Sequence, residues 1–172
     1  MKNSKILITG ISGFVGGGLA ACFLKNGYKV FGLSRKKINN TKFKIYKNSY
    51  SSKDILDIIH KLKPDIIIHC AGSASVGNSI INPSEDFSGS VLLFQSLLEG
   101  VRISEKKPLI IFPSSAAVYG NQEKLPISEI AQLNPISPYG YHKLICELLA
   151  KEYSICYDIP IIAIRLFSLF PV

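Results

Sequence analysis

The chain contains 172 residues, which is enough for one domain with a substantial core. Hydrophobic residues make up 47% and charged residues 19% of it, a balance that excludes a disordered or collagen-like polymer. The formal net charge is +8, and residues 1–53 hold ten lysines and Arg35 without a single acidic residue. We interpret this basic segment as a lysine-rich solvated surface and expect no nucleic-acid partner, because no basic stripe alternates with aromatic residues. A nucleic-acid binder built on this segment is the weakest alternative.

No apolar run reaches the roughly 18 residues that a membrane-spanning helix requires. The first apolar stretch ends at Thr9-Gly10 and does not resemble a secretory signal peptide. We therefore expect no membrane partner and a cytoplasmic location. The cysteines form no C-x-x-C pair and show no metal-ligand spacing, so we expect no metal site. We interpret all four as small buried hydrophobic residues: Cys22, Cys70, Cys146 and Cys156.

Short β-rich runs alternate with helical patterns along the whole chain. The expected strands cover residues 5–9, 28–33, 43–46, 65–69, 108–114 and 159–166. The expected helices cover residues 13–25, 52–61, 83–99 and 139–157, and Ser51 is the expected N-cap of the second helix. This alternation predicts an α/β fold, a Rossmann-type doubly wound parallel sheet flanked by helices, in which residues 1–172 form a single domain.

Three glycines follow the first strand in the segment LITGISGFVGG. In a doubly wound sheet the ligand lies beyond the carboxyl ends of the strands, and the loop after the first strand is the first place to look. Gly10 permits a tight turn, Gly13 lets the backbone approach a pyrophosphate, and Gly16 lets the helix pack closely. The amides of the helix start, with Phe14 and Val15, favour an anion. A bare turn before a helix is the alternative, but the placement between strand and helix predicts a dinucleotide site.

The end of the second strand reads GLSRKK and contains no acid. An acidic residue there bonds the ribose 2′-hydroxyl of NAD, whereas an arginine accommodates the 2′-phosphate of NADP. Ser34, Arg35 and Lys36 therefore predict NAD or NADP as the cofactor and mildly favour NADP.

Tyr139 and Lys143 lie four residues apart at the start of a predicted helix, so they share one face. A lysine ammonium beside a phenol favours phenolate and is expected to lower the tyrosine pKa. Such a tyrosine acts as a general base on a hydroxyl while hydride leaves the same carbon. Ser115, which follows the strand LIIFPS, is placed to hydrogen-bond the same substrate oxygen. The alternative is an ordinary pair on an exposed helix.

Together, the segments TGISGFVG, HCAG, SSAAVYG and SPYGYHK resemble the extended short-chain dehydrogenase/reductase family, in particular the NAD-dependent epimerase/dehydratase group that acts on nucleotide sugars. The resemblance covers nearly the whole chain with the motifs in order. It implies that Ser115, Tyr139 and Lys143 are catalytic. It also implies that the backbone at Cys70, Ala71 and Gly72 lines the cofactor, with Tyr139 and Lys143 reaching it as well.

The chain departs from the family pattern at three places. Asn48, followed by Ser49, stands where the family has an Asp that meets the adenine. Ser90 and Ser168 each replace an Asn. Family members also continue well past the last predicted strand with the residues that build most of the sugar-nucleotide pocket. The resemblance therefore implies a C-terminally truncated member that lacks most of the substrate domain.

The implied function is an NAD(P)-dependent nucleotide-sugar 4-epimerase. Ala116 and Ala117 follow the catalytic serine where dehydratases of the family carry acidic residues, which argues against dehydration. The alternatives are a nucleotide-sugar reductase or dehydratase of the same family and a non-catalytic dinucleotide-binding fragment. The resemblance also implies a homodimer through a bundle of the helices at 83–99 and 139–157. Among the histidines, we expect His69 to pack in the interior and His142 to face solvent.

Overall fold

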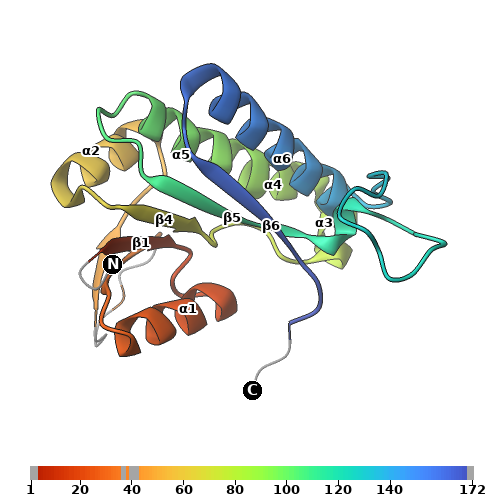
Figure 1. Cartoon of the computed structure of the whole chain (residues 1–172), viewed down its shortest axis with the longest axis horizontal. Helices are drawn as coiled ribbons and strands as arrows, with labels where there is room; N and C mark the ends of the chain where they lie inside the picture. Colours follow the sequence, from red (N-terminus) through yellow and green to blue (C-terminus); the bar gives the residue numbers. More distant parts are fainter. Residues whose placement is uncertain (1–3, 36–37, 39–42, 170–172) are drawn as a thin grey trace.

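The computed structural model describes residues 4–35, 38 and 43–169. Six parallel strands form one sheet in the order β3-β2-β1-β4-β5-β6 (Figure 1). Their bounds are β1 Lys5–Thr9, β2 Lys29–Ser34, β3 Lys44–Lys47, β4 Ile66–His69, β5 Leu109–Ser115 and β6 Ile161–Leu166. This confirms the doubly wound α/β fold, in which the strand order reverses between β1 and β4.

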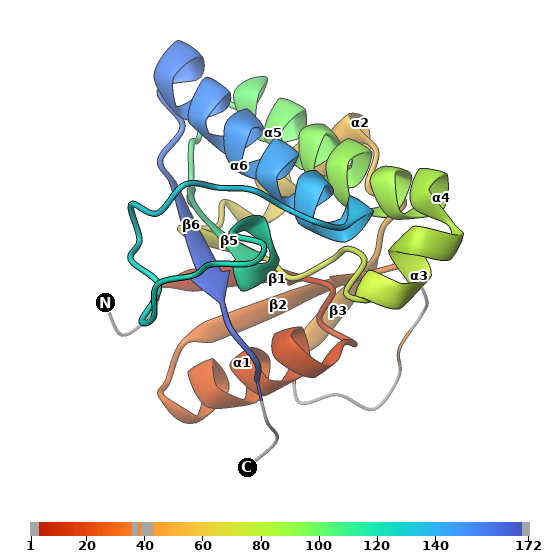
Figure 2. The ribbon, with the colours of Figure 1, turned by 90° about the vertical axis from the view of Figure 1, so that its right-hand side faces the viewer.

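The helices cover both faces of the sheet, but unequally (Figure 2). Helix α1 (Phe14–Lys25) lies on one face, while α2 (Ser52–Leu62), α5 (Leu93–Arg102) and α6 (Pro138–Tyr157) lie on the other. Two apolar clusters follow from this arrangement, a larger one under α2, α5 and α6 and a smaller one under α1. The strands bury side chains on both faces, which is why DIIIH reads as an uninterrupted apolar run.

The segment expected as one helix at 83–99 is three elements in the structure, which corrects the prediction. Helix α4 (Pro83–Phe87) passes into a π-helical turn, η1 (Ser88–Leu92), and then into α5. A further helix that the sequence reading missed, α3 (Val76–Ile81), precedes them. A π turn carries one extra residue and is common at functional sites. Here it coincides with the point where Ser88 and Gly89 face a cavity.

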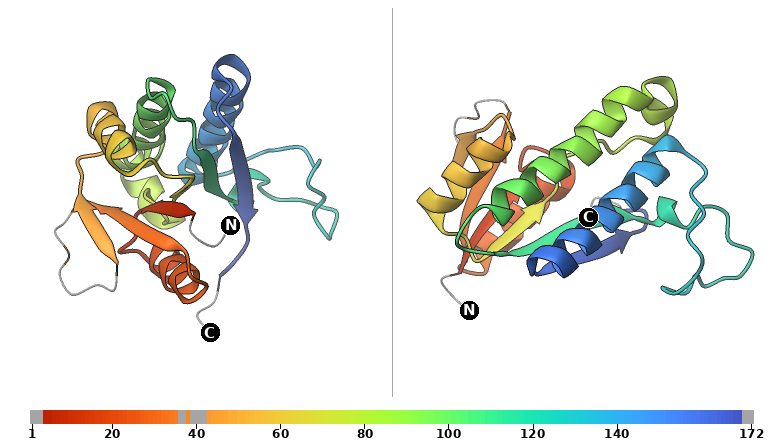
Figure 3. Two further views of the ribbon diagram at one scale, coloured as in Figure 1. Left: turned by 60° about the vertical axis from the view of Figure 1, so that its left-hand side comes forward. Right: turned by 90° about the horizontal axis from the view of Figure 1, so that it is seen from above.

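Local capping was predictable. Ser51 accepts a hydrogen bond from the Asp54 amide at the start of α2, as expected, and Ser137 does the same for Gly140 at the start of α6. A short 3-10 turn, η2 (Ala116–Val118), follows β5. The long connection from η2 to α6 extends away from the body of the molecule (Figure 3).

The reading of all four cysteines as buried is wrong for two of them. Cys146 is buried and Cys70 half-buried, but Cys22 and Cys156 are exposed. Cys22 lies on α1, which buries Gly16 and Ala20 instead, and Cys156 lies in the last turn of α6, beyond the core. Within the described residues, no helix has the length and apolar character to cross a bilayer.

Candidate functional site

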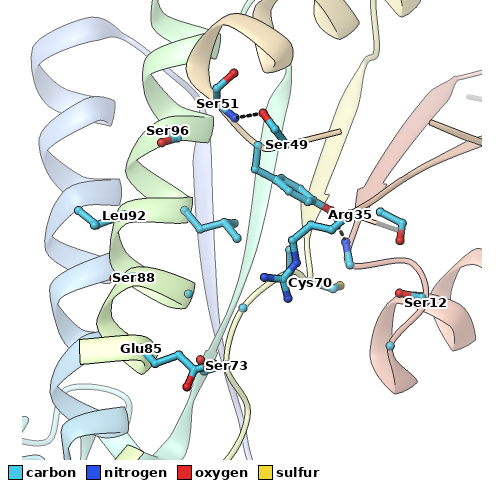
Figure 4. A pocket seen from close by; sticks show the side chains of 18 residues that line it. Ser12, Arg35, Ser49, Ser51, Cys70, Ser73, Glu85, Ser88, Leu92 and Ser96 are labelled. Atoms are coloured by element: carbon cyan, nitrogen blue, oxygen red, sulfur yellow. Dashed lines mark hydrogen bonds between the residues drawn. The ribbon is translucent and has the colours of Figure 1, made fainter. Parts of the chain in front are cut away.

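A cavity of about 800 Å³ opens at the carboxyl ends of β1, β2 and β4 (Figure 4). The glycine loop after β1 forms one wall and the η1–α5 segment forms the opposite wall. Arg35 at the end of β2 extends its side chain into the space between them. The lining residues are Gly10, Ser12, Gly13, Ser34, Arg35, Ser49, Tyr50, Ser51, Cys70, Ala71, Gly72, Ser73, Glu85, Ser88, Gly89, Leu92, Leu93 and Ser96.

The glycine loop has the geometry that its spacing predicts. Gly10 adopts a φ of +65°, and a Cβ built on it would lie 2.5 Å from the Ala71 nitrogen. A Cβ on Gly16 would lie 2.4 Å from the Gly10 carbonyl oxygen, so α1 approaches the loop at a distance that a side chain forbids. Gly13 caps α1 without a side-chain hydrogen bond. The start of α1 therefore faces the cavity with no side chain of its own competing for its amides.

A second cavity of about 230 Å³ adjoins the first and shares the segment from Cys70 to Ser73 with it. The three expected catalytic residues, Ser115, Tyr139 and Lys143, all line this smaller cavity. Its other walls come from Val15, His69, Ala74, Pro113, Ser114, Leu166, Phe167 and Leu169. The segment Cys70–Ser73 therefore lies between the cavity at the glycine loop and the cavity at the tyrosine.

Several contacts hold the three residues in place. The Tyr139 amide donates to the Ser79 hydroxyl, 3.1 Å away, which ties the first turn of α6 to α3. Ser115 and the Tyr139 side chain are hydrogen-bonded. The Lys143 ammonium donates to the Pro113 carbonyl oxygen at 3.0 Å and lies 5.8 Å from the centre of the Tyr139 ring. The end of β5 thus anchors both the serine and the lysine.

The pKa values of the pair correct the expectation that Lys143 lowers the pKa of Tyr139. Burial raises the pKa of Tyr139 above its usual 10, with a smaller increase from the Asp86 carboxylate and a decrease from the hydrogen bond with Ser115. Burial also lowers the pKa of Lys143, against the opposing influence of Cys146, Cys70, Asp86 and Glu147. Desolvation is the largest cause of both shifts, so the net change in the Tyr139 pKa is upward although Lys143 lies nearby.

Comparison with known proteins agrees with this geometry. The profile of the NAD dependent epimerase/dehydratase family matches residues 6–171. The chain belongs to this family. The UDP-glucose 4-epimerase of Yersinia enterocolitica is 33% identical over 180 residues, covering 95% of this chain and 53% of that protein. The UDP-glucose 4-epimerase of Mycolicibacterium smegmatis is 29% identical over 165 residues, which cover 90% of this chain and 53% of that protein.

Solved epimerase structures have the same fold. The UDP-glucose 4-epimerase of Brucella ovis in complex with NAD superimposes with a TM-score of 0.90 at 30% identity, covering 96% of this chain and 52% of that one. A UDP-glucuronic acid 4-epimerase of Bacillus cereus in complex with UDP-glucuronic acid and NAD has a TM-score of 0.82 at 27% identity. The match covers 94% of this chain and 55% of that one. The chain spans about half the length of the epimerases that it matches.

Two departures from the family pattern have different placements. Asn48 does not line the larger cavity, whereas the neighbouring Ser49 does, and the expected contact of Asn48 with adenine stays a prediction. Ser90 is buried behind Gly72, and its hydroxyl has no hydrogen-bond partner among the described residues. Like Asn48, Ser90 lines neither cavity, and its expected contact with the cofactor stays a prediction. Lys36 and the last three residues of the chain lie outside the described residues.

The expectation that His142 faces solvent is wrong. Its Nδ1 lies 2.5 Å from an Asp86 carboxylate oxygen, and both side chains are buried because α4 packs on that face of α6. The expectation for His69 is confirmed, since it is buried against Phe94 and pairs with the Thr9 hydroxyl at 2.9 Å. No sequence signal links positions 86 and 142, which lie on separate elements.

Sequence reasoning also missed a hydrogen-bond network next to Ser115, at Ser114. Glu147 on α6 accepts hydrogen bonds from the Ser114 hydroxyl and, through both oxygens, from the Arg165 guanidinium of β6. Arg165 also donates to the Tyr119 hydroxyl at 2.8 Å. The network joins β5, β6, α6 and the connection after η2. Among the described residues, no cluster of His, Cys, Asp or Glu could hold a metal ion.

Proposed function

We propose that this chain is the dinucleotide-binding and catalytic part of a nucleotide-sugar 4-epimerase, and that residues 1–172 form one NAD(P)-binding domain. One observation carries the proposal: Ser115, Tyr139 and Lys143 meet in a cavity that joins the glycine-loop cavity at Cys70–Ser73. A tyrosine–lysine pair next to a dinucleotide cradle is the arrangement that hydride chemistry at a sugar hydroxyl requires. The solved relatives carry NAD and UDP-sugars.

The residues of the larger cavity fit a dinucleotide. The glycine loop and the start of α1 would hold the pyrophosphate. Ser34 and Arg35 would contact the adenosine ribose, and Ser49 would line the adenosine part of the site. The backbone from Cys70 to Gly72, with Ser90 behind it, would face the nicotinamide half. Gly10 and Gly13 in the loop before α1, and Phe14, Val15 and Gly16 in its first turn, would contribute to this site. When bound, the nicotinamide would supply the hydride acceptor and donor.

In the proposed mechanism Tyr139 takes the proton of the sugar 4-hydroxyl and returns it after the keto sugar has turned over. The hydrogen bond with Ser115 lowers the pKa of Tyr139, so it stabilises the phenolate as well as orienting the substrate oxygen. Lys143, held by the Pro113 carbonyl, adds a positive charge close to the phenolate once it forms. Because burial raises the tyrosine pKa, the resting phenol is protonated, and proton removal needs these two partners.

We further propose that Arg35 lets the site accept NADP as well as NAD. Arg35 lines the cavity at the end of β2, where no acid stands. Isothermal calorimetry with both dinucleotides measures the preference, and Arg35→Asp should shift it toward NAD by removing a 2′-phosphate partner. Arg102→Ala is a matched control, because Arg102 pairs with Glu99 and does not line the cavity. An unchanged NADP-to-NAD ratio in Arg35→Asp contradicts this assignment.

A homodimer through α5 and α6 is a further part of the proposal. Tyr141, Leu148 and Ile155 on α6 are 51%, 58% and 67% exposed. Exposed apolar side chains along one helix favour a partner helix surface. Light scattering on the 172-residue chain measures its mass directly, and a monomer at all concentrations contradicts the dimer.

The function is tested by turnover. UDP-, GDP- and dTDP-hexoses are incubated with the chain and each dinucleotide, and the 4-epimers are separated by chromatography. Epimer formation that disappears in Tyr139→Phe supports the proposal. Tight dinucleotide binding without turnover of any sugar favours the alternative of a binding fragment, and the absence of dinucleotide binding overturns both.

A further inference from the structure

The turn between β3 and α2 does not present to the cavity the residue that the family pattern indicates. The side-chain amide nitrogen of Asn48 donates to the backbone carbonyl oxygen of Asp54 at 3.2 Å. The side-chain oxygen of Asn48 accepts a hydrogen bond from the backbone amide of Tyr50 at 2.7 Å. Asn48 is 7% exposed and both of its polar atoms are engaged within the turn. The residues of this turn that line the cavity are Ser49, Tyr50 and Ser51.

Tyr50 stands out in this turn for its backbone and its contacts. Its φ of +67° is in the left-handed region, which costs a non-glycine residue about 1 kcal/mol or more and is concentrated at functional sites. Its hydroxyl accepts a hydrogen bond from the Gly10 amide at 3.2 Å and donates to the Leu33 carbonyl oxygen at 2.9 Å. One side chain therefore joins the glycine loop to the end of β2, in the wall of the larger cavity.

The hydroxyl is suited to this double role. Burial raises the pKa of Tyr50 above 10, opposed by the Gly10 hydrogen bond and the nearby Arg35 charge, so the hydroxyl is neutral and donates and accepts at once. Gly10 is the loop residue whose own conformation leaves no space for a side chain. A change at Tyr50 is therefore transmitted to the glycine loop and to the β2 end, the two places that meet a dinucleotide.

We propose that Tyr50, and not Asn48, is the residue of the β3–α2 turn that positions the adenosine half of a dinucleotide, with its ring in the cavity wall and its hydroxyl setting the separation of the Gly10 loop from the β2 end. The inference rests on the proposed function to the extent that it assumes dinucleotide binding. The adenosine half is assigned from topology. The β2 end, which meets the adenosine ribose in this fold, lines the larger cavity with Tyr50, whereas Tyr139 and Lys143 line the smaller one.

The test uses dinucleotide fragments and three substitutions. Isothermal calorimetry measures the affinities of NAD, ADP-ribose and nicotinamide mononucleotide for the wild-type chain, Tyr50→Phe, Tyr50→Leu and Asn48→Ala. Loss of one neutral hydrogen bond corresponds to about a fivefold effect, and Tyr50→Phe removes the two that the hydroxyl makes with Gly10 and Leu33. It should therefore weaken NAD and ADP-ribose by about fivefold or more. Tyr50→Leu, which also removes the ring, should weaken both by about tenfold or more.

Two further measurements separate positioning from a general loss of structure. The affinity for nicotinamide mononucleotide should not change in either Tyr50 variant, whereas a merely structural role lowers all three affinities alike. The amide resonance of Gly10 should shift in Tyr50→Phe, which keeps the ring volume and so stays folded. Tyr46→Phe is the matched control, because this tyrosine lies on β3 outside the cavity, beneath Lys44 and Lys61.

The outcomes are distinct. If ADP-ribose binds both Tyr50 variants as it binds the wild type, the assignment is overturned while the proposed function stands. If Asn48→Ala loses more ADP-ribose affinity than Tyr50→Leu, the adenosine contact belongs to Asn48 and the assignment is again wrong. If the wild-type chain binds none of the three ligands, the proposed function fails first and the assignment with it.

Discussion

Gly16 and Gly18 lie two residues apart in α1, and alanine should act on them in opposite directions. A Cβ on Gly18 meets nothing within 4 Å. A Cβ on Gly16 would lie 2.4 Å from the Gly10 carbonyl oxygen and 3.0 Å from both the Gly10 carbonyl carbon and the Ile11 Cα. All three contacts at Gly16 are with backbone, which cannot rotate out of the way.

The magnitudes follow from the two environments. Alanine in a helix interior is better than glycine by about 1 kcal/mol, so Gly18→Ala should raise the free energy of unfolding by roughly that amount. In Gly16→Ala the contact at 2.4 Å falls about 1 Å short of ordinary van der Waals distance, so α1 must move away from the loop. Overpacking costs about 1–3 kcal/mol, and because all three contacts are with backbone we expect the upper part of that range. After the helix gain of about 1 kcal/mol, the net loss is up to about 2 kcal/mol.

Urea denaturation followed by circular dichroism measures both free energies, and calorimetry with NAD measures the effect on the loop. Gly16→Ala should bind NAD about tenfold more weakly because the start of α1 withdraws from the cavity, while Gly18→Ala should bind it as the wild type does. If Gly16→Ala is as stable as Gly18→Ala and binds NAD equally well, then the close approach of α1 to the loop is not what Gly16 provides.

Three further outcomes are expected. Burial lowers the pKa of His69 from 6.5 to about 3. Between these pH values the histidine binds a proton in the unfolded chain but not in the folded chain, so the free energy of unfolding falls as the pH is lowered. From pH 6.5 to pH 4 the wild type should lose about 3 kcal/mol more than His69→Asn in urea titrations, and equal losses would contradict the burial argument. His142→Ala leaves the Asp86 carboxylate buried without its partner and should lower the free energy of unfolding by about 3 kcal/mol, whereas a change below about 1 kcal/mol would mean that the pair is solvated. Tyr139→Phe should lower epimerisation by about 10²–10⁴-fold with an unchanged Kd for NAD, and retained turnover would remove Tyr139 from the mechanism.

Much of the fold follows from local patterns. Apolar runs of strand length between helical periods predicted all six strands within one or two residues, because a strand covered on both faces must be apolar throughout. The Ser51 cap was predictable because its partner, the Asp54 amide, lies three residues away. The glycine loop was predictable for the same reason: its spacing encodes a turn and a close approach within one short segment.

The helix at 83–99 shows the limit of such patterns. The apolar spacing is compatible with one continuous helix. It predicts neither the π turn at Ser88–Leu92 nor the separate helix at Val76–Ile81. The α3 helix is tied to α6 by the Ser79–Tyr139 hydrogen bond, which joins residues more than fifty positions apart, and the π turn lines the larger cavity. Both features therefore involve parts of the chain that local apolar spacing does not describe.

The sequence by itself predicted the α/β class, the glycine loop and the candidate residues Ser115, Tyr139 and Lys143, because each of these features is a pattern within a short stretch of neighbouring residues. The tertiary structure decided which of these groups share a cavity, that His142 is buried on Asp86, and that Tyr50 and not Asn48 faces the larger cavity. It also decided the direction of the Tyr139 pKa shift, because desolvation depends on everything packed around the phenol. Burial and charge at a site are sums over distant residues, and only the folded chain brings those residues together.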